Sequence, residues 1–433
     1  MAPAMSSLPS APRTAAGGQP GHGPALAVLA TVFFMWGFVT VLNDILVPHL
    51  KGIFELTYAQ TMLIQFTFFS AYFLVAMPAA RLTARIGYQR SIVAGLLVMA
   101  VGAVLFVPAA RLASYAMFLG GLYVLASGMT LLQVSANPYV TVLGPPSRAS
   151  SRLNLVQALN SLGTTLGPFV GGMLILSSTT RSPEALRALA PEALEAHRLA
   201  EASSVVGPYL GIAALLVVLA AAIARFRFPP VPAEDAAAGV AAHGSLWHAR
   251  HLVLGAVGIF TYVGAEVAIG SLLVNYLVQL TSGGMTEQAA SRYVSFYWGG
   301  AMAGRFAGSV VLRRFGTGPV VGIAAAAAAM LVTTSMLSAG AVAMWSLILV
   351  GLCNSILFPS IFTLGIAGLG PLTSRASGVL VAAIVGGAVM PLAQGALADA
   401  IGLQPSFVVP AVCYLYIVYY GFAGSRPRPV HGA

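Results

Sequence analysis

Long apolar runs recur along almost the whole chain, each about as long as a helix that crosses a lipid bilayer. The strands of a membrane β-barrel would alternate apolar and polar residues, whereas these runs are apolar on nearly all sides. The composition agrees, since 58% of the residues are hydrophobic and 7% are charged. The sequence therefore predicts an all-α membrane protein with twelve transmembrane helices, near residues 26–50, 58–80, 90–108, 114–143, 152–177, 204–224, 251–280, 289–312, 318–338, 342–369, 375–396 and 404–424.

The basic residues predict how the chain is oriented. If the amino terminus is cytoplasmic, most of the 21 Lys and Arg residues fall on the cytoplasmic side, among them Arg305, and the positive-inside rule places both termini there. The net charge of +10 does not predict nucleic-acid binding, because the basic residues are scattered singly instead of clustered. The opposite side receives six of them: Lys51, Arg111, Arg181, Arg187, Arg198 and Arg292.

A polar connector at 226–250 divides the twelve runs into two groups of six, and the groups share short motifs. LGPPSRASS at 143–151 resembles LGPLTSRASG at 369–378, and ARLTARIGYQRS at 80–91 resembles VVLRRFGTG at 310–318 at nearly the same spacing. Internal repeats of this kind favour a transporter whose halves rock about a site near the bilayer midplane. We expect a disordered cytoplasmic tail (1–24), an N-terminal six-helix half (25–225), a cytoplasmic linker (226–250), a C-terminal six-helix half (251–424) and a cytoplasmic tail (425–433).

Two carboxylates lie inside apolar runs: Asp44 in GFVTVLNDILVPHL and Glu266 in TYVGAEVAIGSLLVNYL. A charge at the centre of a transmembrane helix costs roughly 2.5–3.5 kcal/mol on insertion scales, so such residues usually face a cavity and serve an ion or proton pathway. Neutralisation by a proton or a bound cation removes this cost. We therefore predict that Asp44 and Glu266 are candidates for cation coupling. The alternative for each is a structural hydrogen bond to a neighbouring helix.

Uncharged amides gather on the fourth and fifth runs. Gln133 and Asn137 are four residues apart in LLQVSANPYV, and Gln157, Asn160 and Thr164 share one face in NLVQALNSLGTT. Amides both donate and accept hydrogen bonds, which suits an uncharged, polyhydroxylated substrate such as a sugar. The alternative is that they join transmembrane helices to one another. The remaining candidates are three amides, Asn43, Asn275 and Asn354, and four aromatic residues with a weaker case, Trp36, Tyr276, Tyr297 and Trp298.

Four long stretches, in this order, resemble one family: FFMWGFVTVLNDILVPHLK, SANPYVTVLGPPSRASSRLNLVQALNSLGTT, YVGAEVAIGSLLVNYL and NSILFPSIFTLGI. They are similar to the fucose/galactose/glucose branch of the major facilitator superfamily, and within it to the glucose/galactose transporters. The resemblance implies the major facilitator fold and cation-coupled hexose uptake by alternating access in a bacterial inner membrane. It also implies that Asp44 takes part in cation coupling and sugar release, and that the polar residues of the fourth and fifth helices line a central cavity.

One departure bears on the substrate, because the fucose–proton symporters of the family carry a Glu where this chain has Gln133. The resemblance therefore favours glucose and galactose over fucose and leaves the coupling ion open between a proton and sodium. Uptake of fucose or another hexose, drug export, a sugar receptor that does not transport and a membrane-embedded enzyme remain alternatives. Of these, drug export fits the amide-rich fourth and fifth helices poorly, and an enzyme would need a catalytic constellation that the scattered His residues do not provide.

Nothing in the sequence predicts a cofactor. The GxxxxGK[ST] motif of nucleotide-binding loops is not found, and Cys353 and Cys413 lie in separate apolar runs without metal-ligand spacing. We expect a functional monomer whose partners are a hexose and the lipid bilayer, with no enzymatic activity and no nucleic-acid partner.

Overall fold

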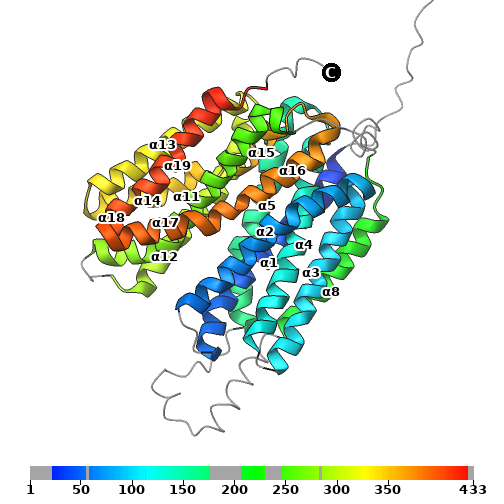
Figure 1. The fold of residues 1–433 in the computed structure, drawn as a ribbon, viewed down its shortest axis with the longest axis horizontal. Coiled ribbons are helices and arrows are strands. Elements are labelled where there is room, and N and C mark those ends of the chain that lie inside the picture. The colour runs from blue at the N-terminus through cyan, green and yellow to red at the C-terminus, as the bar shows by residue number, and fades with distance from the viewer. Residues whose placement is uncertain are drawn as a thin grey trace, which may run out of the picture.

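The computed structural model describes residues 22–54, 58–112, 114–175, 206–229, 246–281 and 285–427, and these are helical almost throughout. Most of the expected tail at 1–24 and of the linker at 226–250 lies outside the described residues. Figure 1 shows two groups of long helices side by side, coloured blue to green and green to red. The first group contains α1 (His22–Phe54), α2 (Tyr58–Ile86), α3 (Tyr88–Arg111), α4 (Tyr115–Val142), α5 (Ala149–Ile175) and α8 (Val206–Arg225).

The second group repeats this plan, with breaks in its last three spans. Its first three helices are α11 (Arg250–Leu280), α12 (Glu287–Val311) and α13 (Thr317–Leu337). The next three spans each consist of two helices, which are α14 (Gly340–Asn354) with α15 (Leu357–Gly365), α16 (Thr373–Ala382) with α17 (Gly386–Ile401), and α18 (Leu403–Ser406) with α19 (Val408–Tyr419). Short 3₁₀ turns precede α5, α11 and α16 and join α16 to α17, and a π-helical turn, Tyr420–Gly424, follows α19.

The twelve predicted runs each correspond to one of these helical spans. Ten spans are long and apolar enough to cross a membrane by length and composition within the described residues. The other two are α5 and α12, which are less apolar than the rest because they carry polar residues at the boundary between the two groups.

The helix contacts in the first group recur in the second. In the first group, α1 packs on α5, and α3 packs on both α4 and α8. In the second, α11 packs on α17, and α13 packs on both α14 and α19. Across the boundary α2 contacts α16, and α5 contacts α12. The chain thus consists of two six-helix halves with the same internal arrangement, as the repeated motifs predict.

Glycine allows a close approach between α1 and α5. At Gly163 on α5, an added Cβ would lie 2.2 Å from the main-chain oxygen of Phe34 on α1, so only hydrogen fits between the two backbones. Without a hydrophobic driving force between helices in lipid, such small-residue contacts provide much of the packing energy. They hold α1 and α5 together, and both helices carry residues of the site described next.

Candidate functional site

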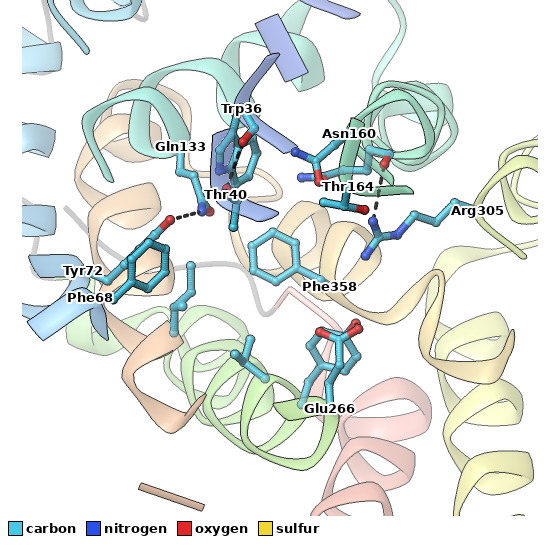
Figure 2. A pocket seen from close by; sticks show the side chains of 14 residues that line it. Trp36, Thr40, Phe68, Tyr72, Gln133, Asn160, Thr164, Glu266, Arg305 and Phe358 are labelled. Carbon is cyan, nitrogen blue, oxygen red and sulfur yellow. Dashed lines mark hydrogen bonds between the residues drawn. The ribbon is translucent and has the colours of Figure 1, made fainter. Parts of the chain in front are cut away.

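A cavity of about 210 Å³ lies between the two halves (Figure 2). A single water needs roughly 10–15 Å³ measured in this way, so the space is large enough for a small molecule. Residues from α1, α2, α4, α5, α11, α12 and α15 and from the turn before α17 reach it: Trp36, Thr40, Phe68, Tyr72, Gln133, Gln157, Asn160, Thr164, Tyr262, Val263, Glu266, Arg305, Phe358 and Ile384.

Three of the predicted amides line the cavity, and all three belong to the first half. Gln133 donates from Nε2 to the Tyr72 hydroxyl at 3.1 Å, and its Oε1 has no hydrogen-bond partner among the described residues although the side chain is only 5% exposed. Gln157 donates from Nε2 to Asn137 Oδ1 at 3.4 Å, and Asn160 donates from Nδ2 to the Phe33 main-chain oxygen at 2.9 Å. Each amide is held on one side through its nitrogen, and its oxygen makes no hydrogen bond with the described residues.

Asn137 lies behind this row. It is fully buried and is not among the residues that line the cavity; its Oδ1 orients Gln157, and its Nδ2 has no partner among the described residues. Thr40 and Thr164 add hydroxyl groups, and Trp36, Phe68 and Tyr72 add aromatic rings on the same side. This wall therefore combines hydrogen-bonding groups with ring faces, a mixture typical of small-molecule sites.

Glu266 is the predicted carboxylate that the structure places at the cavity. Its Oε1 accepts a hydrogen bond of 2.7 Å from the Tyr262 hydroxyl, which also lies 3.2 Å from the main-chain oxygen of Asn354. Asn354 is buried behind this pair, where Nδ2 donates to the Tyr297 hydroxyl at 2.8 Å and Oδ1 accepts from the Tyr414 hydroxyl at 2.7 Å. Asn354 and Tyr297 thus brace the helices around Glu266 and do not line the cavity themselves.

The structure corrects the sequence-based assignment of Arg305 to the cytoplasmic side. It lies within α12 and lines the cavity, and in Figure 2 its guanidinium group points toward the labelled polar residues of the first half. The guanidinium donates to main-chain and side-chain oxygens from both halves, so the helix packing offsets the cost of placing the charge there. The signal was present in the sequence, because an arginine inside an apolar run is a candidate functional residue by default.

Several other candidates lie elsewhere. Asn43 and Asp44 belong to α1, but their side chains are outside the part that the structure describes. Asn275 is exposed on α11 and is not a cavity residue. Among the aromatic candidates only Trp36 lines the cavity; the Tyr276 hydroxyl contacts Ser335 on α13, and Trp298 is 43% exposed.

Hydrogen bonds close the boundary between the halves at one end of the molecule. This end, called the terminal face below, is where α1 begins and the chain leaves its last helix. The Ser150 and Thr363 hydroxyl oxygens are 2.6 Å apart, Asn154 Nδ2 donates to Ser360 Oγ at 3.3 Å, and Ser151 Oγ donates to the Ser309 main-chain oxygen at 2.6 Å. These residues of α5, α12 and α15 form a polar seal between the cavity and the terminal face.

A proline-dependent bond extends the seal to α4 and α16. Pro138 has no N–H group, so the main-chain oxygen of Val134, one turn earlier, lacks its helical donor. Ser377 on α16 donates to this oxygen at 2.9 Å. The proline that interrupts the hydrogen-bond ladder of α4 therefore supplies an acceptor for the opposite half.

A metal centre is not indicated in the described part of the chain, where no three His, Cys, Asp or Glu residues are grouped to hold an ion. Cys413 is buried and Cys353 half-buried, and both are free thiols. The groups that line the cavity, which are amides, hydroxyls, aromatic rings and two ionisable side chains of opposite sign, suit reversible binding.

Comparison with known proteins gives one consistent result. The family model of the Major Facilitator Superfamily matches residues 27–383. The chain is 52% identical over 408 residues to the glucose/galactose transporter of Brucella abortus, covering 94% of this chain and 96% of that one. It is 36% identical over 401 residues to the L-fucose-proton symporter of Escherichia coli, covering 91% of each chain.

The solved structures agree with the sequence relatives. A crystal structure of the major facilitator superfamily transporter FucP in the outward conformation superposes with a TM-score of 0.85 at 34% identity, covering 92% of this chain and 98% of that one. Fold, helix order and sequence lead to the same assignment, and the chain belongs to the major facilitator superfamily.

Proposed function

We propose that this protein is a secondary active transporter that takes up glucose and galactose together with a cation by alternating access. The observation that carries the proposal is the cavity between the two halves, where Gln133, Gln157 and Asn160 present partly unused amides beside aromatic rings. Sugars offer hydroxyl groups that match amides and apolar ring faces that match aromatic side chains. The name of the 52% identical relative, a glucose/galactose transporter, supports the same substrate class.

We assign the first substrate contacts to these three amides, with Asn137 and Asn354 as buried supports. Asn43 and Asn275 remain proposed contacts of lower rank, since neither side chain is placed at the cavity among the described residues. Asp44 is the proposed coupling carboxylate and Glu266 the second candidate. The coupling ion is a proton or sodium; the name of the 36% identical relative, a fucose-proton symporter, supports the proton.

The proposed orientation places the terminal face in the cytoplasm of a bacterial cell, with the protein in the inner membrane as a monomer. Basic residues at the ends of helices on that face support it through the positive-inside rule, including Arg85, Arg148, Arg225, Arg250, Arg313 and Arg314. In this orientation the polar seal closes the cytoplasmic side, so the cavity belongs to an outward-facing state. The functional units are the halves 25–225 and 251–424, joined by the linker 226–250.

The test is transport by purified protein in proteoliposomes. Labelled glucose, galactose and fucose are offered separately, with the pH gradient and the sodium gradient imposed independently. We expect accumulation of glucose and galactose under one of the two gradients and weaker accumulation of fucose. Saturable binding of these sugars without counterflow would indicate a receptor, and export of a lipophilic cation without sugar movement would contradict the proposal.

A further inference from the structure

The guanidinium group of Arg305 is fixed by residues from both halves. Its Nε donates to the main-chain oxygen of Ser355 at 3.1 Å, and its Nη1 donates to the Ser161 hydroxyl and, at 3.4 Å, to the main-chain oxygen of Gln157. The Ser355 oxygen lacks a helical donor because residue 359, one turn later, is a proline without an N–H group. Arg305 is therefore held by two main-chain oxygens and one side-chain hydroxyl, and one of these main-chain oxygens belongs to Gln157, a proposed sugar contact.

These bonds use two of the three guanidinium nitrogens and leave the third, Nη2, without a partner among the described residues. The side chain is half-buried and lines the cavity. A charged donor in such a place must bond to water or to a ligand, because an unsatisfied one costs several times more than a lost neutral hydrogen bond. In Figure 2 the guanidinium lies beside Asn160 and Thr164, at the side of the cavity where the amides gather.

Glu266 supplies the opposite charge. Of the described residues that line the cavity, only Glu266 and Arg305 carry a charged side chain, and both come from the second half. Glu266 is also anchored on one side, by the Tyr262 hydroxyl at 2.7 Å. The second half thus presents one fixed donor and one fixed acceptor, of opposite charge, to the same space, while the first half presents amides.

We propose that Arg305 is a specificity-determining residue that donates a hydrogen bond from Nη2 to one hydroxyl oxygen of the bound hexose. The inference rests on the proposed function and deepens it by naming a contact in the second half. Arginine donates but cannot accept, so it selects a sugar with an oxygen at one defined ring position. A charge-assisted bond of this kind corresponds to about a 10- to 100-fold difference in affinity.

The test pairs ligand changes with protein changes. Calorimetry on the purified full chain measures the affinities of galactose and of a series of its monodeoxy analogues, for the parent, Arg305→Met and Arg305→Lys. We expect Arg305→Met to bind galactose about 10- to 100-fold more weakly. In the parent, removing one particular hydroxyl from galactose should weaken binding, and this loss of affinity should vanish in Arg305→Met. The losses of affinity at the other positions should persist. Arg314→Met, an exposed arginine just beyond α12, is the matched control and should keep the parental pattern.

The outcomes separate the two levels of the proposal. If the parent binds no hexose, the proposed function fails. If the parent binds galactose and the loss of affinity for each deoxy analogue is the same in Arg305→Met as in the parent, the Arg305 contact is refuted while the proposed function stands. If Arg305→Met does not fold, as judged by gel filtration and thermal melting, Arg305→Lys provides the test. The single ammonium group of lysine cannot reproduce the guanidinium geometry, so the affinity lost on removing that one hydroxyl must become smaller. If the affinity losses are the same as in the parent at every position, the contact is refuted.

Discussion

Ser150 on α5 and Thr363 on α15 meet across the boundary between the two halves, with their hydroxyl oxygens 2.6 Å apart. They belong to the polar seal, which also joins Asn154 to Ser360, Ser151 to the main chain of Ser309, and Ser377 to the main chain of Val134. A neutral hydrogen bond contributes only about 0.5–1.5 kcal/mol net, because water replaces it when the partners separate. The contacts among hydroxyls, the Asn154 amide and main-chain oxygens can therefore separate without a large electrostatic cost, as alternating access requires.

Cross-linking this pair should stop transport. We expect Ser150→Cys/Thr363→Cys, in a chain with Cys353 and Cys413 changed to Ala, to form a disulfide under mild oxidation because the paired atoms already touch. Uptake should fall to background on oxidation and return on reduction, while sugar binding from the open side persists. Each single-cysteine variant is the control. Full uptake by a quantitatively cross-linked protein would show that the seal does not open during transport.

Replacing the carboxylate of Asp44 should separate exchange from accumulation. Asp44→Asn mimics the neutralised side chain permanently, so sugar binding no longer depends on cation binding. We expect counterflow of labelled galactose to remain within a few-fold of the parent, whereas accumulation under an imposed proton or sodium gradient is lost. Accumulation like that of the parent would remove Asp44 from the coupling role, and Glu266→Gln would then be the next variant to measure.

The amides at the cavity predict a contrast between two alanine variants. Gln157→Ala removes a cavity-lining amide, so sugar affinity should fall about 10-fold or more. It also leaves the buried Asn137 without its partner, which should lower the stability by about 1–3 kcal/mol without preventing folding. Gln279→Ala removes an exposed amide of α11 that is not at the cavity and should leave affinity unchanged. Calorimetry measures the affinity and a thermal melt the stability. Equal affinity for both variants would mean that Gln157 only joins helices.

Packing between α1 and α5 predicts a stability difference between two glycines. Gly163→Ala forces a methyl group against the Phe34 backbone, which should destabilise the protein by about 1–3 kcal/mol. Gly211→Ala on α8 meets nothing within 4 Å, so helix propensity alone should make it neutral or slightly stabilising. Thermal melting in detergent compares the two variants. A parental melting temperature for Gly163→Ala would show that the two helices can separate without loss.

The helical plan was predictable because a bilayer imposes it. Backbone groups in hydrocarbon must be satisfied within each segment, so apolar runs of sufficient length become helices whatever they pack against. Helical spacing alone also puts Gln157, Asn160 and Thr164 on a common face, and all three line the cavity. The repeated motifs predicted two halves for a similar reason, since equivalent turns close equivalent helix pairs.

Other features depend on which helix lies beside which. Arg305 lies inside an apolar run, which marks it as a candidate, but only the packing of α12 against α5 makes it a cavity residue with acceptors from both halves. Asn137 and Asn354 resemble ligand-binding amides in sequence, yet tertiary contacts use them to orient Gln157 and to bind Tyr297 and Tyr414. Helical periodicity specifies the face on which a side chain lies. Whether that face meets a cavity, a neighbouring helix or lipid is decided by contacts between residues far apart in sequence.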